Sequence, residues 1–195
     1  MSRRERSIEP DWFEDLFARE GDPWDFETSA YEAAKYADTL AHLPPAPIGR
    51  ALEVGCANGV LTERLAGRVD ELTALDVSPT ALAAARGRCS DAANVRFVKC
   101  RAPREMPDGP FDLVVLSEVV YYWARDDVAR LAEWVTAGGV AKGGHLLLVH
   151  WTGDTDYPLS GDEAMETLLG ELTGVTVEVA ERREKYRLDR WRWVG

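Results

Sequence analysis

The chain has 195 residues, enough for one domain with a sizeable core, and 46% of them are hydrophobic, as in an ordinary globular protein. Its formal net charge of -11 disfavours nucleic acid as a partner, because a phosphate backbone would be repelled on average, so we expect a neutral or cationic small molecule. We see no membrane-spanning apolar run, no secretory signal, no metal-ligand spacing and no disulfide framework, and we expect a cytoplasmic protein without a metal ion. The sequence specifies no oligomeric state.

The N-terminal part of the chain predicts two helices. Apolar residues recur at helical spacing over 11–17, and Gly-Asp-Pro at 21–23 breaks the pattern. Ser29 can then cap a second helix over 30–43, with Glu32 completing a capping box. Three prolines shortly afterwards end that helix.

The rest of the chain alternates between strand and helix patterns, which predicts a parallel sheet with helices on both faces. The last two segments are tightly joined and carry alternating charges, so we expect an antiparallel hairpin at the sheet edge. We interpret the whole chain as one domain, with residues 1–47 as a helical cap or lid and 48–195 as the α/β core. Strands are expected near 51–55, 72–76, 95–99, 111–117, 145–150, 175–184 and 186–194, and helices near 59–67, 79–88, 126–137 and 162–172.

The stretch 51–60 reads as a strand, a tight glycine turn and the start of a helix. Gly55 and Gly59 allow unusual backbone angles and close approach of a ligand, and the helix start offers free N–H groups. Open α/β sheets bind their ligands at this kind of position. The spacing Glu53-x-Gly55-x-Ala57-x-Gly59 does not fit the Gly-x-Gly-x-x-Gly pattern of dinucleotide sites, which disfavours a nicotinamide dehydrogenase.

That spacing resembles motif I of the class I S-adenosylmethionine (SAM) methyltransferases, with Ala57 at the usual middle glycine. Asp76 closes the next apolar run, where an acid can hold both ribose hydroxyls. Related folds often place an acid after the third strand to bind the adenine amine, whereas this chain has Cys100 and Arg101. A structural turn without a ligand is the alternative. The predicted cofactor-binding residues are Trp24, Tyr31, Glu53, Gly55, Cys56, Ala57, Gly59, Asp76, Val77, Cys100, Arg101, Ser117 and Glu118.

Ser117 and Glu118 end the fourth strand, which lies beside the first strand in such folds. Tyr121 and Tyr122 follow them. Aromatic rings beside a carboxylate suit a cation, because ring faces attract positive charge, and SAM is a sulfonium. The alternative is that these rings fill the core.

The fifth strand ends at His150, and the loop after it is dense in acids and aromatic residues. A histidine there could accept a proton, although a strand-end histidine bonded to backbone is the commoner arrangement. Loops at this edge of a sheet often carry function. The predicted catalytic residues are Glu118, His150, Tyr121 and Tyr122. The predicted substrate-binding residues are Tyr122, Trp151, Asp154, Asp156 and Tyr157.

Several stretches together resemble the NodS-type nodulation methyltransferases, and the similarity covers most of residues 22–190. The matching stretches are 22–44, 51–66, 111–123, 143–163 and 186–189. The resemblance implies a seven-stranded, mostly parallel sheet whose last strand is antiparallel. It also implies transfer of a methyl group from SAM, leaving S-adenosylhomocysteine (SAH), to the free amine of the non-reducing glucosamine of a de-N-acetylated chitooligosaccharide. It implies the reaction type better than the substrate.

In this interpretation the segment from Trp24 to Tyr36 folds over the cofactor as a lid and excludes water, with Tyr31 and Lys35 as further candidate contacts. A plain cap helix that packs its aromatic residues into the core is the alternative.

We expect in-line displacement at the sulfonium carbon by a neutral amine, since an ammonium has no lone pair. Glu118 or His150 could take the proton, and Asp154 and Asp156 could orient the amine. Two other interpretations stay open: SAM-dependent methylation of a hydroxyl or another small amine, and a non-catalytic SAM-binding partner protein.

Overall fold

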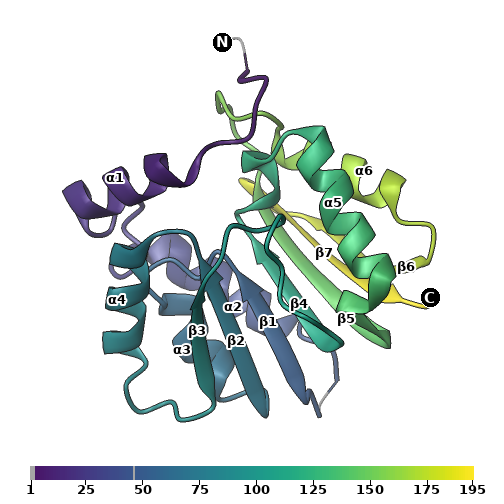
Figure 1. Cartoon of the computed structure of the whole chain (residues 1–195), viewed down its shortest axis with the longest axis horizontal. Helices are drawn as coiled ribbons and strands as arrows, with labels where there is room; N and C mark the ends of the chain where they lie inside the picture. Colours follow the sequence, from purple (N-terminus) through teal and green to yellow (C-terminus); the bar gives the residue numbers. More distant parts are fainter. Residues whose placement is uncertain (1–2, 46) are drawn as a thin grey trace.

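The computed structural model describes residues 3–45 and 47–195, in which seven strands form one sheet with helices on both faces (Figure 1). Residues 1, 2 and 46 of the predicted cap lie outside the described residues. The strands are β1 (Arg50–Val54), β2 (Glu71–Asp76), β3 (Val95–Lys99), β4 (Phe111–Ser117), β5 (Val140–Trp151), β6 (Val175–Arg182) and β7 (Tyr186–Trp193). The helices are α1 (Pro10–Glu20), α2 (Ala30–Ala41), α3 (Val60–Ala66), α4 (Pro79–Arg88), α5 (Arg125–Trp134) and α6 (Gly161–Glu171). Two short turns, η1 (Val120–Tyr122) and η2 (Val135–Gly139), flank α5.

The sheet has the strand order β3-β2-β1-β4-β5-β7-β6. Strands β1 to β5 are parallel to one another, and β7 pairs antiparallel with both β5 and β6. The predicted mostly parallel sheet with an antiparallel last strand is therefore confirmed. The chain order reverses between β1 and β4, so a crevice is expected at the carboxyl ends of these strands.

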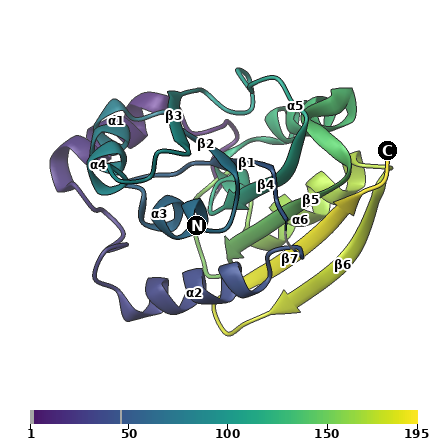
Figure 2. The same ribbon diagram turned by 90° about the horizontal axis from the view of Figure 1, so that it is seen from below.

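The central strands are buried on both faces of the sheet, which explains why β1 and β4 read as continuous apolar runs. Successive residues of a strand point to opposite faces. Leu52 and Val114 pack in the cluster that includes α5 and α6, whereas Ala51 and Val115 pack in the cluster that includes α2 and α3. Accordingly, α2 and α5 lie on opposite sides of the sheet (Figures 1 and 2). Within the described residues, no helix is both long and apolar enough to cross a lipid bilayer.

Helix α2 begins as predicted, but its capping box is only half formed. The Ser29 hydroxyl accepts a hydrogen bond from the Glu32 N–H at 3.3 Å. The Glu32 carboxylate does not return to the cap, because it binds Lys35 at 3.0 Å instead. The helix ends at Ala41, two residues earlier than expected.

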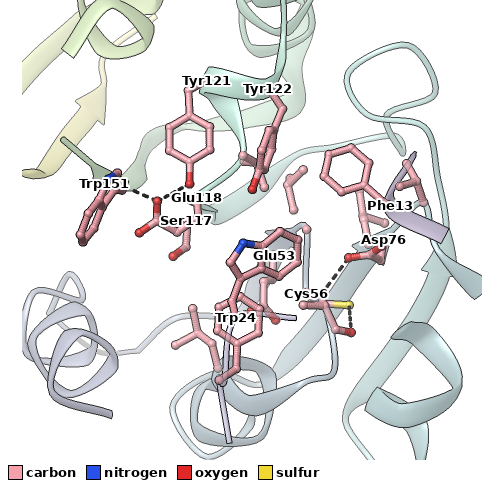
Figure 3. A pocket seen from close by; sticks show the side chains of 18 of the residues that line it. Phe13, Trp24, Glu53, Cys56, Asp76, Ser117, Glu118, Tyr121, Tyr122 and Trp151 are labelled. Carbon is pink, nitrogen blue, oxygen red and sulfur yellow. Dashed lines mark hydrogen bonds between the residues drawn. The ribbon is translucent and has the colours of Figure 1, made fainter. Parts of the chain in front are cut away.

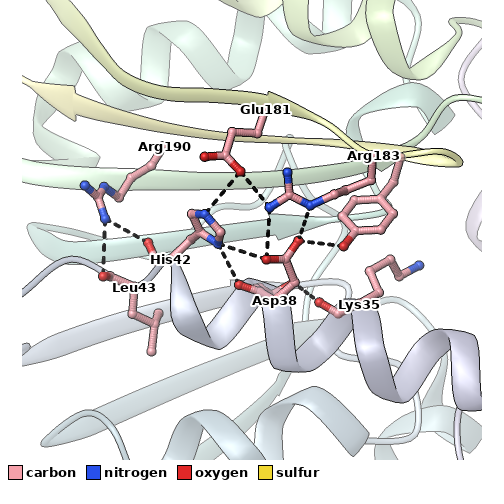
Figure 4. Close-up of polar contacts among 9 residues, drawn as sticks. Lys35, Asp38, His42, Leu43, Glu181, Arg183 and Arg190 are labelled. Atoms are coloured by element: carbon pink, nitrogen blue, oxygen red, sulfur yellow. Dashed lines mark hydrogen bonds and ion pairs between the residues drawn. The ribbon is translucent and has the colours of Figure 1, made fainter.

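The second half of α2 is tied to the β6–β7 hairpin by a polar cluster (Figure 4). Asp38 accepts hydrogen bonds from Arg183 Nε at 2.9 Å and from the Tyr186 hydroxyl at 2.6 Å. His42 lies between two carboxylates, 3.3 Å from Asp38 Oδ1 and 3.5 Å from Glu181 Oε2. The cluster fixes one end of a helix whose other end borders the carboxyl edge of the sheet.

Candidate active site

A cavity of about 420 Å³ opens at the carboxyl ends of the central strands (Figure 3). The residues that end β1, β2 and β4 form one side of it, and α1, α2 and the loop after β5 contribute the others. Its volume lies in the range of small-molecule sites, which are mostly apolar with a few placed polar groups. This edge is where the strand order predicts a ligand.

Most of the predicted site residues line this cavity. They are Trp24, Tyr31, Glu53, Gly55, Cys56, Ala57, Asp76, Val77, Cys100, Ser117, Glu118, Tyr121, Tyr122, Trp151 and Tyr157. The predicted site residues that do not line it are Gly59, Arg101, His150, Asp154 and Asp156.

The glycine turn brings backbone to the cavity. Gly55 has a φ of 77°, and a Cβ there would lie 2.3 Å from Val119 Cγ1, so only glycine fits. Ala57 has a φ of 49°, in the left-handed region that favours glycine, which agrees with its place at the usual glycine of the motif. Its N–H donates to Asp76 Oδ2 at 2.9 Å, and this bond holds the turn against β2.

Gly59 does not line the cavity, and its visible role is structural. It caps α3 with a φ of 83°. A Cβ at Gly59 would lie 2.9 Å from both Cα and Cβ of Ala85 on α4. This glycine therefore lets α3 and α4 approach each other beside the site.

Two buried carboxyls lie at the ends of β1 and β2. Asp76 accepts backbone hydrogen bonds from Ala57 and Ser78, each at 2.9 Å. Burial raises the pKa of Asp76, and these bonds oppose that effect. Glu53 accepts a hydrogen bond from the Thr62 hydroxyl at 2.6 Å, and burial raises its pKa to about 8. Glu53 is thus largely protonated at neutral pH.

Glu118 is held at the end of β4 by three donors. Lys35 Nζ lies 2.6 Å from Oε1, while the Tyr121 hydroxyl at 2.6 Å and the Trp151 N–H at 2.8 Å bind Oε2. Burial on its own would raise the pKa of Glu118, but the positive charge of Lys35 and the hydrogen bonds outweigh it and hold the pKa below its ordinary value. Glu118 is consequently ionised.

His150 lies behind the site and not in it. Its side chain is fully buried, and Nε2 accepts the Val120 N–H at 3.1 Å. The ring proton therefore lies on Nδ1. Burial lowers the pKa of His150 to about 4. The structure thus has the backbone-bonded arrangement and gives no support to His150 as a base at the cavity.

The other three outlying residues lie toward the surface. The Arg101 guanidinium pairs with Glu9. Asp154 is exposed, and Asp156 pairs with Arg4 at 3.2 Å. Two other predicted residues are their neighbours in the sequence and do line the cavity. Cys100 precedes Arg101, and Tyr157 follows Asp156.

The cavity also has lining residues that we did not predict, two of them from α1. Phe13 and Phe17 face it, and Glu14 fixes the helix by accepting hydrogen bonds from the Ser78 and Thr80 hydroxyls, each at 2.6 Å. The helical spacing of the aromatic residues signals a buried face of α1. It does not signal that this face covers a site.

The strand order, the glycine turn and the strand-end acids at one cavity define a class I, SAM-dependent methyltransferase. Residues 10–135 match the family described as Nodulation protein S (NodS). The chain belongs to this NodS family.

Two relatives support this family assignment. Nodulation protein S of Rhizobium tropici is 34% identical over 164 residues, which cover 84% of this chain and 68% of that protein. Nodulation protein S of Sinorhizobium fredii (strain NBRC 101917 / NGR234) is 34% identical over 127 residues, covering 65% of this chain and 59% of that protein. This chain thus spans about 60 to 70% of the length of these two relatives.

A solved structure confirms the fold. The N-methyltransferase NodS from Bradyrhizobium japonicum WM9, in complex with SAH, has a TM-score of 0.82 to this chain at 23% identity. The superposition covers 95% of this chain and 98% of that one.

Proposed function

We propose that the protein transfers the methyl group of SAM to the amine of an amino sugar, or of an oligosaccharide or glycoside that carries one. The observation that supports this acceptor is a group of aromatic rings around a carboxylate. The Tyr121 and Tyr157 rings stack with centroids 5.3 Å apart, and Tyr122 contacts both. The Tyr121 hydroxyl and the backbone N–H of Trp151 donate to the Glu118 carboxylate. Aromatic faces and an ionised carboxylate attract a cationic group such as a protonated amine.

The cofactor side of the cavity fits SAM in this proposal. Asp76 holds the ribose hydroxyls, and the turn at Gly55 and Ala57 receives the amino-acid part. Cys100 and Val77 border the adenine. SAM supplies an activated methyl group on a sulfonium. The protein therefore has to bind the cofactor and the acceptor, orient them towards each other and exclude water.

The acceptor nucleophile is a neutral amine, because an ammonium has no lone pair. A sugar amine loses its proton more readily than lysine does. Positioning of the amine by Tyr122 and Tyr157, under the cover of α1 and α2, therefore supplies much of the acceleration. Glu118 orients these parts, because its three hydrogen bonds join α2, η1 and β5.

The name of the solved relative supports transfer to nitrogen, since that protein is called an N-methyltransferase. The amino-sugar acceptor rests on the resemblance to nodulation methyltransferases and on the chemistry of the cavity.

The test is a methylation assay with radiolabelled SAM. Glucosamine and a chitosan tetramer are the acceptors, and the fully N-acetylated tetramer is the matched control without a nucleophilic amine. We expect label on the free amines and none on the acetylated oligomer. Equal labelling of both oligomers would indicate a hydroxyl acceptor and contradict the proposal.

A binding measurement separates the enzyme from a non-catalytic binder. Calorimetric titration with SAM, SAH and NAD should show binding of the first two only. SAM binding without turnover on amino sugars or on other small amines would contradict the proposed reaction and leave the cofactor assignment standing.

A further inference from the structure

Two acidic side chains share one cation inside the cavity. Lys35 Nζ lies 2.6 Å from Glu118 Oε1, and 3.0 and 2.9 Å from the two carboxylate oxygens of Glu32. Lys35 is 3% exposed and Glu32 8% exposed, and all three residues line the cavity. With both acids ionised, the cluster carries one uncompensated negative charge.

The two carboxylates differ in their capacity to accept a hydrogen bond from a ligand. Both oxygens of Glu118 are engaged by donors from the protein, namely Lys35, Tyr121 and the Trp151 N–H. Glu118 therefore orients the site and has little capacity left to receive a substrate proton.

Glu32 has an oxygen without a hydrogen bond. Its Oε1 accepts a hydrogen bond from Lys35. Oε2 lies 2.9 Å from Lys35 Nζ as an ion-pair contact, but it accepts no hydrogen bond within residues 3–45 and 47–195. A buried acceptor left unsatisfied is unfavourable, so an N–H donor that reaches it gains binding free energy. Burial raises the pKa of Glu32, and the neighbouring Lys35 opposes that shift.

We propose that Glu32 is the amine receptor of the cavity, with Oε2, which pairs with Lys35 but accepts no hydrogen bond from the protein, accepting one from the amine of a bound ligand. Two ligands present this chemistry: the α-ammonium group of the cofactor and the amine of the acceptor. The acceptor source rests on the proposed function. For an acceptor that arrives as an ammonium, one N–H bond breaks, an O–H bond forms on Glu32, and the nitrogen keeps the electron pair that attacks the methyl group.

The first arm of the test measures the cofactor source without turnover. Calorimetry gives the affinities of SAH and of an SAH analogue that lacks only the α-amino group. If Glu32 receives the cofactor ammonium, the wild type prefers SAH by about tenfold to a hundredfold, the range for a hydrogen bond to a charged group. Glu32→Gln should lose most of that preference. Glu171→Gln, which changes an exposed carboxylate at the end of α6, should keep it.

The second arm measures the acceptor source. With the chitosan tetramer, Glu32→Gln should raise KM about tenfold or more and move the pH profile of kcat/KM to higher pH, because the amine must then arrive without its proton. Glu32→Asp keeps the charge and withdraws it by one methylene, so it should restore part of the rate. It also provides the test if the Gln variant does not fold, which its unfolding temperature reports.

The inference is overturned if Glu32→Gln is folded and keeps the SAH preference, the KM and the pH profile of the wild type. The proposed function can fail separately. If the wild type methylates no amino sugar, the calorimetric comparison with SAH still tests the role of Glu32. A preference for SAH that is the same in Glu32→Gln as in the wild type then overturns the inference.

Discussion

Lys35 Nζ lies 2.6 Å from Glu118 Oε1 and joins helix α2 to the carboxyl end of β4. One partner belongs to the segment before the sheet, and the other follows a central strand. The ion pair therefore links the wall of the cavity to the sheet beneath it. Because it is buried, its loss has consequences for the whole fold and not only for the site.

Replacing Lys35 by Met should destabilise the protein by about 3–5 kcal/mol, because Glu118 would remain buried without its cation. Urea unfolding monitored by circular dichroism measures the change. Lys142→Met is the control, since Lys142 is exposed and its loss should change the free energy of unfolding by less than about 0.5 kcal/mol. Equal stabilities of the two variants would show that Glu118 does not depend on Lys35.

Replacing Gly59 by Ala should destabilise the fold by roughly 1–3 kcal/mol, because the residue has a φ of 83° and the new Cβ would lie 2.9 Å from Ala85. Gly67→Ala is a matched control at the other end of α3. Its φ is -77° and nothing lies within 4 Å of the added Cβ, so it should be neutral or stabilising by up to about 1 kcal/mol. Thermal unfolding of both variants checks the contrast. A loss of SAH affinity in Gly59→Ala without a loss of stability would restore Gly59 as a cofactor contact.

Replacing Asp76 by Ala should weaken SAH binding about a hundredfold or more. The variant loses the proposed bonds to the ribose and also the carboxylate that fixes the Ala57 N–H, and each hydrogen bond to a charged group contributes roughly 1.5–3 kcal/mol. Calorimetry with SAH measures the change, and Asp126→Ala, at an exposed position of α5, is the control. An effect below about fivefold would remove Asp76 from the proposed cofactor site.

The sequence predicts that the strand-end residues of the cavity lie together, for a physical reason. Asp76 and Glu118 each follow an apolar run, and parallel strands bring their carboxyl ends to one edge of the sheet. Periodicity and strand order therefore suffice to place them together.

The helical contribution could not be predicted in the same way. Glu32 and Lys35, three residues apart on a helix, look like a solvent-exposed pair. Only the packing of α2 buries them, and it brings Lys35 to Glu118 just after β4. His150 shows the opposite problem. It lies at the end of a strand, as predicted, but its Nε2 accepts a hydrogen bond from the Val120 N–H of η1. Nothing in the sequence specifies that bond.

Glu53 should make the stability of the protein fall as the pH rises. Its side chain is 2% exposed, and burial raises its pKa from the ordinary 4.5 to about 8. Between these two values the folded protein keeps a proton that the unfolded chain has released. The unfolded state then binds fewer protons, so the free energy of unfolding decreases with pH, by up to about 1.4 kcal/mol per pH unit, and levels off above pH 8.

Replacing Glu53 by Gln isolates this contribution, because the amide keeps an oxygen for the Thr62 hydroxyl and cannot ionise. The stability of Glu53→Gln relative to the wild type should therefore increase from pH 5 to pH 8. Urea unfolding at intervals across that range measures the difference. Glu133→Gln, at an exposed position on α5, should show no comparable trend. A difference between Glu53→Gln and the wild type that is constant over this range would mean that Glu53 ionises at its ordinary pKa, and that the first strand ends in a charged residue even before a ligand arrives.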